Sequence, residues 1–307
     1  RDLLERLIKM SVRSFCKEVT KPKDESYFFV LEHLPTSEIH GVSGIFSKIG
    51  LKFPFYSYKV LNITKKSKSL KKEKTYKILK LLSISNGPSE IGGLYLDPNH
   101  RKKGLGKFLS LSRFMFIANW RQRFEKKVIA EMRGISSKSG RSPFWDRVGV
   151  KFFDVSFKEA DLMTVTNRQF IDDLVPRYPI YVNLLPEDAQ SVIGQPHKHT
   201  VPAFNFLKDQ GFSVLSQVDI FDGGPKLRCL TKSIKSVKNT SQMTLNVKQG
   251  MGFKKFKETF IVGTNKLVDY RAVFCEGEVL NGQFYCEEWV IQNLGISDME
   301  TVIVCSV

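Results

Sequence analysis

The sequence predicts an α/β (α+β) fold, in which helices flank a mixed, mostly antiparallel sheet. Short apolar runs of strand length alternate with helix-like segments, as where Gly92–Leu96 precedes Phe108–Trp120. The 307 residues are 42% hydrophobic and 26% charged, which suits a globular protein of one large or two unequal domains. Towards the C-terminus the pattern changes to short strands separated by turns. We therefore expect a main region over residues 1–235 and a small β-rich module over residues 245–307.

The first ninety residues predict one helix, two strands and a long irregular stretch. Leu3, Leu4, Leu7 and Ile8 recur at helical spacing, so the chain begins as if already inside a helix. Two strands follow, joined by a turn rich in Pro, Thr and Ser. The next stretch is aromatic and then lysine-rich, and we interpret it as an excursion between strands with a packed loop over residues 53–58. The predicted ranges are Arg1–Lys17, Tyr27–Leu31, His40–Ile45 and Ile49–Gly87.

A strand, a glycine-bearing turn and a helix follow at residues 92–120. Asp97-Pro98-Asn99 ends the strand, and the basic run Arg101–Lys107 contains Gly104 and Gly106. A helix that begins after such a turn offers unpaired backbone N–H groups and the positive end of its dipole, both of which favour a pyrophosphate. Glycine lets the phosphates approach the backbone. The alternative is a basic turn that precedes a core helix.

The second half predicts short helices and strands in alternation. Ser142, Pro143 and Gly149 suit the N-cap, first position and end of one short helix. Asp222-Gly223-Gly224-Pro225 predicts a tight turn, and the polar, basic run Thr231–Thr244 predicts a linker. We expect strands at Lys127–Arg133, Val150–Val155, Phe212–Phe221, Thr259–Val262, Asp269–Phe274, Gly282–Cys286 and Val302–Val307, and helices at Asn167–Leu174, Leu184–Ile193, Pro202–Gln210 and Glu287–Leu294.

Charge and cysteine content restrict the class of protein. The five cysteines are scattered without a Cys-x-x-Cys pair, which favours a reducing, cytoplasmic location and argues against a zinc site. No apolar run reaches the length of a membrane span. The formal net charge is +17, and Lys65–Lys80 holds eight lysines and one glutamate. This run suits a solvated surface, a nucleic-acid patch or the steering of an anionic acyl-CoA, and the lack of Arg or aromatic interleaving disfavours nucleic acid.

The segment at residues 92–107 resembles the acyl-CoA signature of the GNAT superfamily of N-acyltransferases. Five further motifs, in order, resemble the bacterial arginine N-succinyltransferase family over roughly residues 1–235. The resemblance implies a GNAT-like fold whose first strand and helix precede Arg1, and transfer of succinyl from succinyl-CoA to the α-amino group of L-arginine in arginine degradation. The motifs are Ala130–Gly134, Ser142–Trp145, Pro179–Tyr181, Val192–Gln195 with His197, and Phe221–Pro225.

The resemblance also implies how succinyl-CoA, the acyl donor, is held. In the superfamily the loop cradles the pyrophosphate of coenzyme A, which here implies Arg101, Gly104, Leu105 and Gly106. The preceding strand lies beside the pantetheine arm, which implies a contact through the backbone of Leu94. No metal is expected.

Amide formation by direct attack needs proton transfer but no enzyme nucleophile. His197 is the candidate catalytic acid/base, because its ordinary pKa suits proton transfer near neutrality and the proton donor proposed for the family aligns with it. The alternative is a structural or exposed loop histidine. His199 is a nearby rival without that support.

Three further residues are candidate substrate ligands. Glu131 lies in an otherwise apolar strand, so it either pairs with Arg133 or another cation or contacts the substrate arginine. Asp222 is a turn former or a partner for a guanidinium. Arg133 is a candidate for the succinyl carboxylate, and Arg141 is favoured as a surface ion pair. Phe144 and Trp145 are expected in the core.

Two other functions stay open at this stage. One is a GNAT acyltransferase that uses another acyl-CoA or amine, and the other is a non-enzymatic basic protein that binds nucleic acid. The expected partners are small-molecule substrates, without a membrane, and homo- or hetero-oligomeric assembly stays open.

Overall fold

A computed structural model describes residues 2–101, 104–137, 140–166, 168–248 and 256–307. The chain forms two compact units, and each contains segments that are distant in sequence. Unit 1 comprises Arg1–Lys48, Ser89–Val128 and Leu230–Val307, and unit 2 comprises Ile49–Pro88 and Ile129–Cys229. The predicted boundary between residues 235 and 245 stays a prediction, because the two units divide the chain at other positions. Among the described residues, no helix is both long and apolar enough to cross a membrane.

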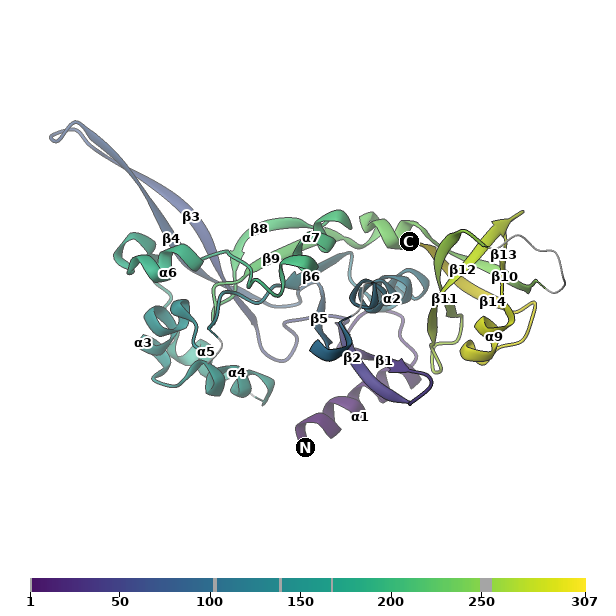
Figure 1. The fold of residues 1–307 in the computed structure, drawn as a ribbon. Helices are drawn as coiled ribbons and strands as arrows, with labels where there is room; N and C mark the ends of the chain where they lie inside the picture. The colour runs from purple at the N-terminus through teal and green to yellow at the C-terminus, as the bar shows by residue number, and fades with distance from the viewer. Residues whose placement is uncertain (1, 102–103, 138–139, 167, 249–255) are drawn as a thin grey trace. The chain divides into compact units, whose positions relative to one another are not determined.

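In unit 1, helices pack on an antiparallel sheet of β1, β2 and β5 (Figure 1). The edge strand β1 is covered by α1, whose Ser14 and Ser11 hydroxyls accept hydrogen bonds from the N–H groups of Ser26 and Phe28, at 3.0 and 2.9 Å. These bonds satisfy donors that an open sheet edge would expose. The bounds are α1 Asp2–Cys16, β1 Ser26–His33, β2 Glu38–Phe46, β5 Ser89–Leu96, α2 Leu105–Asn119 and α8 Lys235–Lys238.

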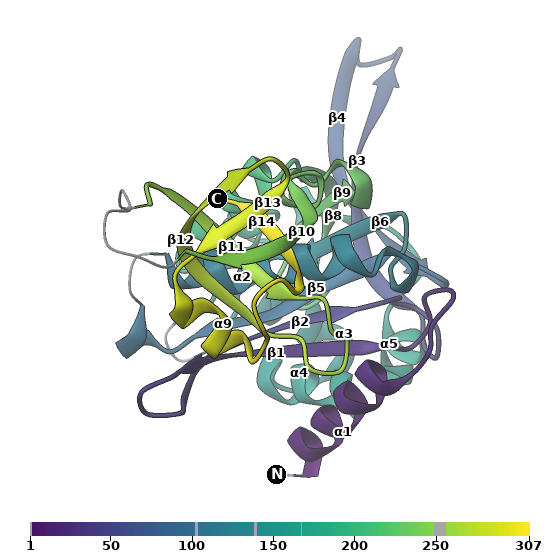
Figure 2. The same ribbon diagram turned by 90° about the vertical axis from the view of Figure 1, so that its right-hand side faces the viewer.

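The C-terminal part of unit 1 is a small closed barrel, as Figure 2 shows. Its strand order is β10-β13-β12-β11-β14, in which β10 and β13 are parallel and the other neighbours antiparallel. Phe260, Phe284 and Val302 belong to its own buried apolar cluster. The predicted β-rich module is therefore confirmed. The bounds are β10 Thr240–Val247, β11 Glu258–Thr264, β12 Ala272–Leu280, β13 Gln283–Cys286, α9 Glu288–Leu294 and β14 Thr301–Ser306.

Unit 2 combines an antiparallel sheet with a group of short helices (Figure 1). Its core packs Phe144, Trp145 and Ile171 from the helices with Tyr58 and Leu79 from the sheet. Strand β6 carries the chain from unit 1 into unit 2. The bounds are β3 Phe55–Ser67, β4 Lys72–Ile84, β6 Lys127–Glu131, α3 Val150–Phe153, α4 Phe157–Thr166, α5 Gln169–Leu174, β7 Ile180–Tyr181, α6 Glu187–Val192, α7 Val201–Asp209, β8 Ser213–Val218 and β9 Pro225–Leu230.

The predicted fold class, a mostly antiparallel sheet with flanking helices and a small β-module, is confirmed. The expected excursion at Ile49–Gly87 is wrong, because β3 and β4 form a hairpin with continuous register from Phe55 opposite Ile84 to Ser67 opposite Lys72. Residues 55–58, expected in a packed loop, are buried as the start of β3. Lysines on both strands obscure the alternation of apolar and polar residues that would have indicated two strands.

The predicted strand at Val150–Val155 is also wrong, because most of it is helical. The helix that begins after Ser142 continues through Gly149 as a π-helical turn and ends at Phe153. Gly149 does not end the helix. A Cβ at that position would overlap the indole ring of Trp145, so glycine makes room for this large, fully buried side chain.

The predicted linker at Thr231–Thr244 is wrong as well. A 3-10 turn, α8 and the first half of β10 occupy it, and Thr231, Ile234 and Val237 are buried. Of the predicted helix Asn167–Leu174, Asn167 lies outside the described residues, and α5 covers the remainder from Gln169.

Candidate functional site

In unit 1, the segment from β5 to α2 has the geometry of an anion-binding loop. The Asp97 side chain accepts a hydrogen bond from the N–H of Asn99 at 2.7 Å and begins a single 3-10 turn. Gly104 then adopts a left-handed conformation, with φ at 95°, as the N-cap of α2. The first backbone bond of α2 runs from Phe108 N–H to the Gly104 carbonyl at 2.8 Å. The N–H groups of residues 105–107 therefore have no acceptor within the helix.

Space for a ligand exists directly at this helix start. A Cβ at Gly104 would meet no described atom within 4 Å, and one at Gly106 would meet only the Leu96 side chain, at 3.9 Å. Arg101 is exposed and its Nε donates to the Leu96 carbonyl at 3.2 Å. The predicted Lys102 and Lys103 of this basic run lie outside the described residues. Among the described residues, no side chain has to move for an anion to approach the backbone here.

Leu94 lies in an irregular part of β5. The register with β2 pairs Val42 with Tyr95 and Gly44 with Gly92, so two residues of β5, Gly93 and Leu94, face one residue of β2. Gly93 has φ at 58°, which is the conformation of a glycine β-bulge. The bulge interrupts the β2 ladder at Leu94, the position expected to offer its backbone to the acyl donor.

In unit 2, His197 lies in a loop whose backbone is fixed to the segment after β6. The His197 N–H donates to the Arg133 carbonyl at 2.8 Å, and Pro196 forms a bridge with Gly134. Thr200 Oγ1 donates to the His197 carbonyl at 2.8 Å, just before α7 begins. These hydrogen bonds fix the backbone of His197, and so the position of its Cβ, although the residue lies in a loop.

The His197 ring is half-buried and favours its neutral form. Burial, followed by the nearby positive charge of Arg133, lowers its pKa from 6.5. Its Nδ1 accepts the N–H of His199 at 3.2 Å, so the proton of the neutral ring sits on Nε2. The ring of the rival, His199, lies 5.1 Å away and is exposed.

Glu131 forms an ion pair with Lys226 of β9, and not with Arg133. The Lys226 ammonium is buried, pairs with Glu131, and donates to Ser57 Oγ and to the Tyr56 carbonyl, the latter at 3.3 Å. It also lies 4.3 Å from the centre of the Phe55 ring. Burial raises the pKa of the Glu131 carboxyl, while the charge of Lys226 opposes that shift. A quarter of the Glu131 side chain remains exposed to solvent.

Asp222 joins two backbone segments that cross at Gly134 and Gly224. One carboxylate oxygen accepts the N–H of Gly134 at 2.7 Å, and the other accepts the N–H of Gly224 at 2.8 Å. Burial, and then the negative charge of Asp219, raises the pKa of Asp222 to about 8. Both oxygens are engaged with backbone, which is the arrangement of a turn former.

Comparison with known proteins assigns the chain to a family. Residues 1–236 match the family described as arginine N-succinyltransferase beta subunit. The chain belongs to the arginine N-succinyltransferase family. It is 43% identical over 228 residues to an arginine N-succinyltransferase of Yersinia pseudotuberculosis serotype O:3, covering 74% of this chain and 65% of that protein. It thus spans less than two thirds of that relative's length. A relative from Yersinia enterocolitica is 39% identical over 251 residues, which is 81% of this chain and 72% of that protein.

A solved structure from the same family has a similar fold. Subunit AI of the arginine/ornithine succinyltransferase of Pseudomonas aeruginosa aligns with a TM-score of 0.88 at 30% identity. The match covers 99% of this chain and 88% of that one. The recognised family and the GNAT-like fold class are therefore confirmed.

The structure also describes the surroundings of the other expected residues. Arg133 is exposed, while its carbonyl anchors the His197 loop. Arg141 forms an ion pair with Asp146 at 2.9 Å, which is the surface pair that we favoured. Phe144 and Trp145 are fully buried, as expected.

Sequence reasoning missed two features of this member of the family. Lys226 lies between Pro225 and Leu227, and strand alternation places it on the same face as the exposed Arg228, so no sequence signal marked it as buried. The sequence predicts a regular strand over Gly92–Leu96, whereas the strand is interrupted by a bulge at Gly93. Gly92-Gly93 within a strand is a signal for a bulge and could have indicated one.

Proposed function

We propose that the chain transfers succinyl from succinyl-CoA to the α-amino group of L-arginine, as an enzyme of arginine degradation. The family match over residues 1–236 carries this proposal. The open start of α2 and the bulge at Leu94 support it, because they suit the pyrophosphate and the pantetheine arm of an acyl-CoA. In the proposal Arg101, Gly104, Leu105 and Gly106 hold the phosphates through backbone N–H groups and one positive charge.

The reaction forms one bond and breaks one. The neutral amine attacks the thioester carbonyl, a C–N bond forms, and the tetrahedral intermediate then loses the coenzyme A thiolate as the C–S bond breaks. The amine nitrogen must give up a proton and the sulfur must gain one. His197 is suited to move this proton. Because its ring is neutral before reaction, Nδ1 can take the amine proton in place of the His199 N–H that it accepts, while Nε2 gives its proton to the sulfur.

Charged groups of unit 2 offer recognition of both substrates. Glu131, whose side chain is one quarter exposed, is our candidate for the guanidinium, with Lys226 holding its carboxylate in place. The exposed Arg133 is our candidate for the succinyl carboxylate, which it can bind in a bidentate manner. Asp222, first considered for the guanidinium, is assigned the positioning of Gly134 and so of the His197 loop.

A thiol-release assay tests the proposal. Succinyl-CoA and acetyl-CoA are each offered with arginine, ornithine or lysine, since the solved relative is named for both arginine and ornithine. We expect kcat/KM to be highest for succinyl-CoA with arginine. Thiol release that no amine accelerates, or acetyl-CoA that performs better than succinyl-CoA, would refute the proposal.

A matched pair of arginine variants separates the acyl specificity from general charge effects. Arg133→Gln should lower kcat/KM for succinyl-CoA at least tenfold and leave acetyl-CoA nearly unchanged, because only succinyl has a second carboxylate. Arg141→Gln removes the same charge from an exposed ion pair and should alter neither. Equal losses for both acyl donors in Arg133→Gln would reject its assignment.

We also propose that the protein works as an oligomer. The family is described as a beta subunit, and the solved relative is named as a subunit. Light scattering after size-exclusion chromatography should therefore give a mass above that of one chain, and a monomer at working concentration would contradict this.

A further inference from the structure

Three metal-ligating side chains, none of which is assigned to acyl transfer, come together in unit 1. They are His33 at the end of β1 and Glu38 and His40 on β2. Each offers one ligand atom, and the three atoms lie within 4.8 Å of one another. None of them belongs to the acyl-CoA loop or to the motifs that resemble the family.

The hairpin between β1 and β2 creates this grouping. The backbone turns through residues 34–37, where Ser37 has φ at 54°, and the register then places His33 directly opposite Glu38. Glu38 and His40 are two residues apart on one strand, so they share a face of the sheet. A carboxylate and two imidazoles thus converge because of strand pairing and not because of loop geometry.

Hydrogen bonds already join the three side chains. Glu38 Oε2 lies 3.4 Å from His40 Nε2 and accepts the Thr36 hydroxyl at 3.2 Å. The same hydroxyl lies 2.9 Å from His33 Nδ1. Ionised carboxylate and imidazole are the forms that bind metals.

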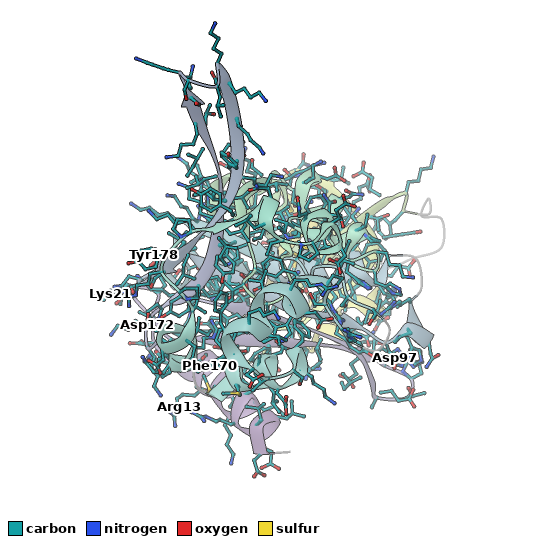
Figure 3. The ribbon with its side chains drawn as sticks, turned by 90° about the vertical axis from the view of Figure 1, so that its left-hand side faces the viewer. Arg13, Lys21, Asp97, Phe170, Asp172 and Tyr178 are labelled. Carbon is teal, nitrogen blue, oxygen red and sulfur yellow. The ribbon has the colours of Figure 1, made fainter. Side chains whose placement is uncertain are left out.

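A third histidine holds the central ring in place. His40 is 9% exposed and stacks between His33, at 5.1 Å between ring centres, and His100, at 3.5 Å. His100 Nδ1 is buried and makes no hydrogen bond among the described residues, and the carboxylate of Asp97 lies 3.7 Å from it. Asp97 is labelled in Figure 3. The stack fixes the orientation of His40, as a neighbour of a metal ligand commonly does.

We propose that His33, Glu38 and His40 bind one divalent transition-metal ion of the zinc class. Zinc accepts two imidazole nitrogens and one carboxylate oxygen and leaves a fourth position for water. Ligand atoms on a tetrahedral zinc ion lie about 3.4 Å apart, given bonds of about 2.1 Å. Glu38 Oε2 and His40 Nε2 already have this separation. The exposed ring of His33, which stacks on His40 at an interplanar angle of 16°, has to turn so that its nitrogen reaches the same ion. Magnesium is disfavoured, because it prefers oxygen ligands alone.

The expectation of no zinc site came from the spacing of the cysteines and did not consider histidines across a hairpin. None of the three ligands is assigned to acyl transfer, although His40 contacts the segment between β5 and α2: His100 stacks on its ring, and its carbonyl accepts the Asp97 N–H at 2.8 Å. The inference therefore stands or falls independently of the proposed function.

Isothermal titration with zinc chloride, on protein without a histidine tag, tests the site. We expect one equivalent that His33→Gln or Glu38→Gln weakens at least tenfold, with no matching signal from magnesium. Glu32→Gln is the matched control, because it removes the same charge from the neighbouring residue of the hairpin. His199→Gln tests whether the His197–His199 pair contributes, and should leave this equivalent intact.

A second measurement covers the case in which a variant folds poorly. Cobalt bound to the wild type should give the intense visible absorption of a four-coordinate site, and this should disappear in His33→Gln, whose exposed side chain is not needed for packing. Binding should also weaken as pH falls, because protonated imidazole cannot ligate. Zinc affinity that is unchanged in His33→Gln and His40→Gln, or absent from the wild type at millimolar zinc, would overturn the proposal.

Discussion

Two glycine-bearing turns in this protein have opposite surroundings. At Gly104, in unit 1, a Cβ would meet no described atom within 4 Å. At Gly224, in unit 2, a Cβ would clash with the carbonyl oxygen of Met132 and approach the nitrogen of Gly134 within 2.6 Å. The first glycine leaves space beside the backbone, and the second lets two segments of the chain's own backbone cross.

The comparison shows what a glycine in a motif means physically. Space that the protein leaves empty beside unpaired N–H groups is available to a ligand. Space that another backbone segment fills, as Met132–Gly134 does beside Gly224, serves packing. The neighbouring Asp222 then accepts hydrogen bonds from the N–H groups that the crossing buries. On this argument we assign ligand binding to the turn at Gly104, and positioning of the His197 loop to the crossing at Gly224. The predictions that follow challenge this division, beginning with the largest effect.

Loss of His197, whose loop the Gly224 crossing positions, should have the largest effect on turnover. His197→Ala should lower kcat about a hundredfold to ten-thousandfold, the range for loss of a general acid–base. Coenzyme A affinity should hardly change, because the loop that we assign to the phosphates is a separate segment. Steady-state kinetics and titration of coenzyme A measure the two effects. His199→Ala is the control, and a larger loss there than in His197→Ala would reverse the assignment.

The pH profile should identify the same group. Because burial and Arg133 lower the pKa of His197, turnover should decline only when the pH falls below about 6.5, as the ring gains a proton and can no longer accept one. His197→Ala should lose this acidic limb. A limb that persists in the variant would assign the titration to another group.

The crossing itself should affect stability. Gly224→Ala places a methyl group against a backbone carbonyl that cannot move aside, so we expect the free energy of unfolding to fall by about 3 kcal/mol, the upper range for overpacking. Gly92→Ala is the control, since its Cβ would meet the Phe46 ring at an ordinary 3.6 Å. Urea denaturation followed by circular dichroism compares them, and equal stability of both variants would contradict the packing argument.

Much of the fold follows from local patterns, and the exceptions have physical causes. The strands at residues 27–31 and 92–96 were predicted close to their observed bounds, because apolar runs there end in turn residues. Gly149 suggested a helix end, but it is glycine because the indole of Trp145 needs the room. The β3–β4 hairpin was missed because lysines occupy both strands, including an opposed pair at Lys65 and Lys74.

The candidate site was predictable only where one segment contains it. The turn at Gly104 lies between a strand and a helix that follow each other within residues 89–119, so its geometry could be anticipated from sequence. The partner of Glu131 could not, because Lys226 comes from a strand ninety-five positions later and alternation suggested that it was exposed. The His33–Glu38–His40 cluster likewise depends on strand register, which spacing alone does not reveal.

Substitutions at Gly104 test whether the open space at this turn serves ligand binding. Gly104→Ala and Gly295→Ala both place a Cβ in open space at positive φ, 95° and 64°, so each should lose about 1–2 kcal/mol of stability. Only Gly104→Ala should also weaken coenzyme A binding, by about tenfold, because its Cβ occupies the approach to the phosphates. Titration calorimetry and thermal melts measure both. Unchanged coenzyme A affinity in Gly104→Ala and in Gly106→Val would reject the phosphate cradle.

The smallest effect should come from the β3–β4 hairpin, where Figure 3 shows side chains that end in nitrogen projecting from the distal part. The lysines there are exposed on both strands, and Lys65 opposes Lys74 with like charge. Replacing four of them by glutamine should leave turnover within about twofold and stability within about 1 kcal/mol. The four are Lys65, Lys68, Lys71 and Lys74.

A control with the same loss of charge elsewhere decides what this hairpin does. Glutamine at four other exposed lysines, Lys151, Lys158, Lys232 and Lys235, lowers the net charge equally. If the hairpin is only a solvated surface, both variants bind DNA weakly and with similar salt dependence. Tight DNA binding at physiological salt, with a steep salt slope that only the hairpin variant loses, would instead assign nucleic-acid contacts to these lysines. Equal slowing of succinyl-CoA association in both variants would show that the charge of the whole chain, and not this hairpin, steers the anionic substrate.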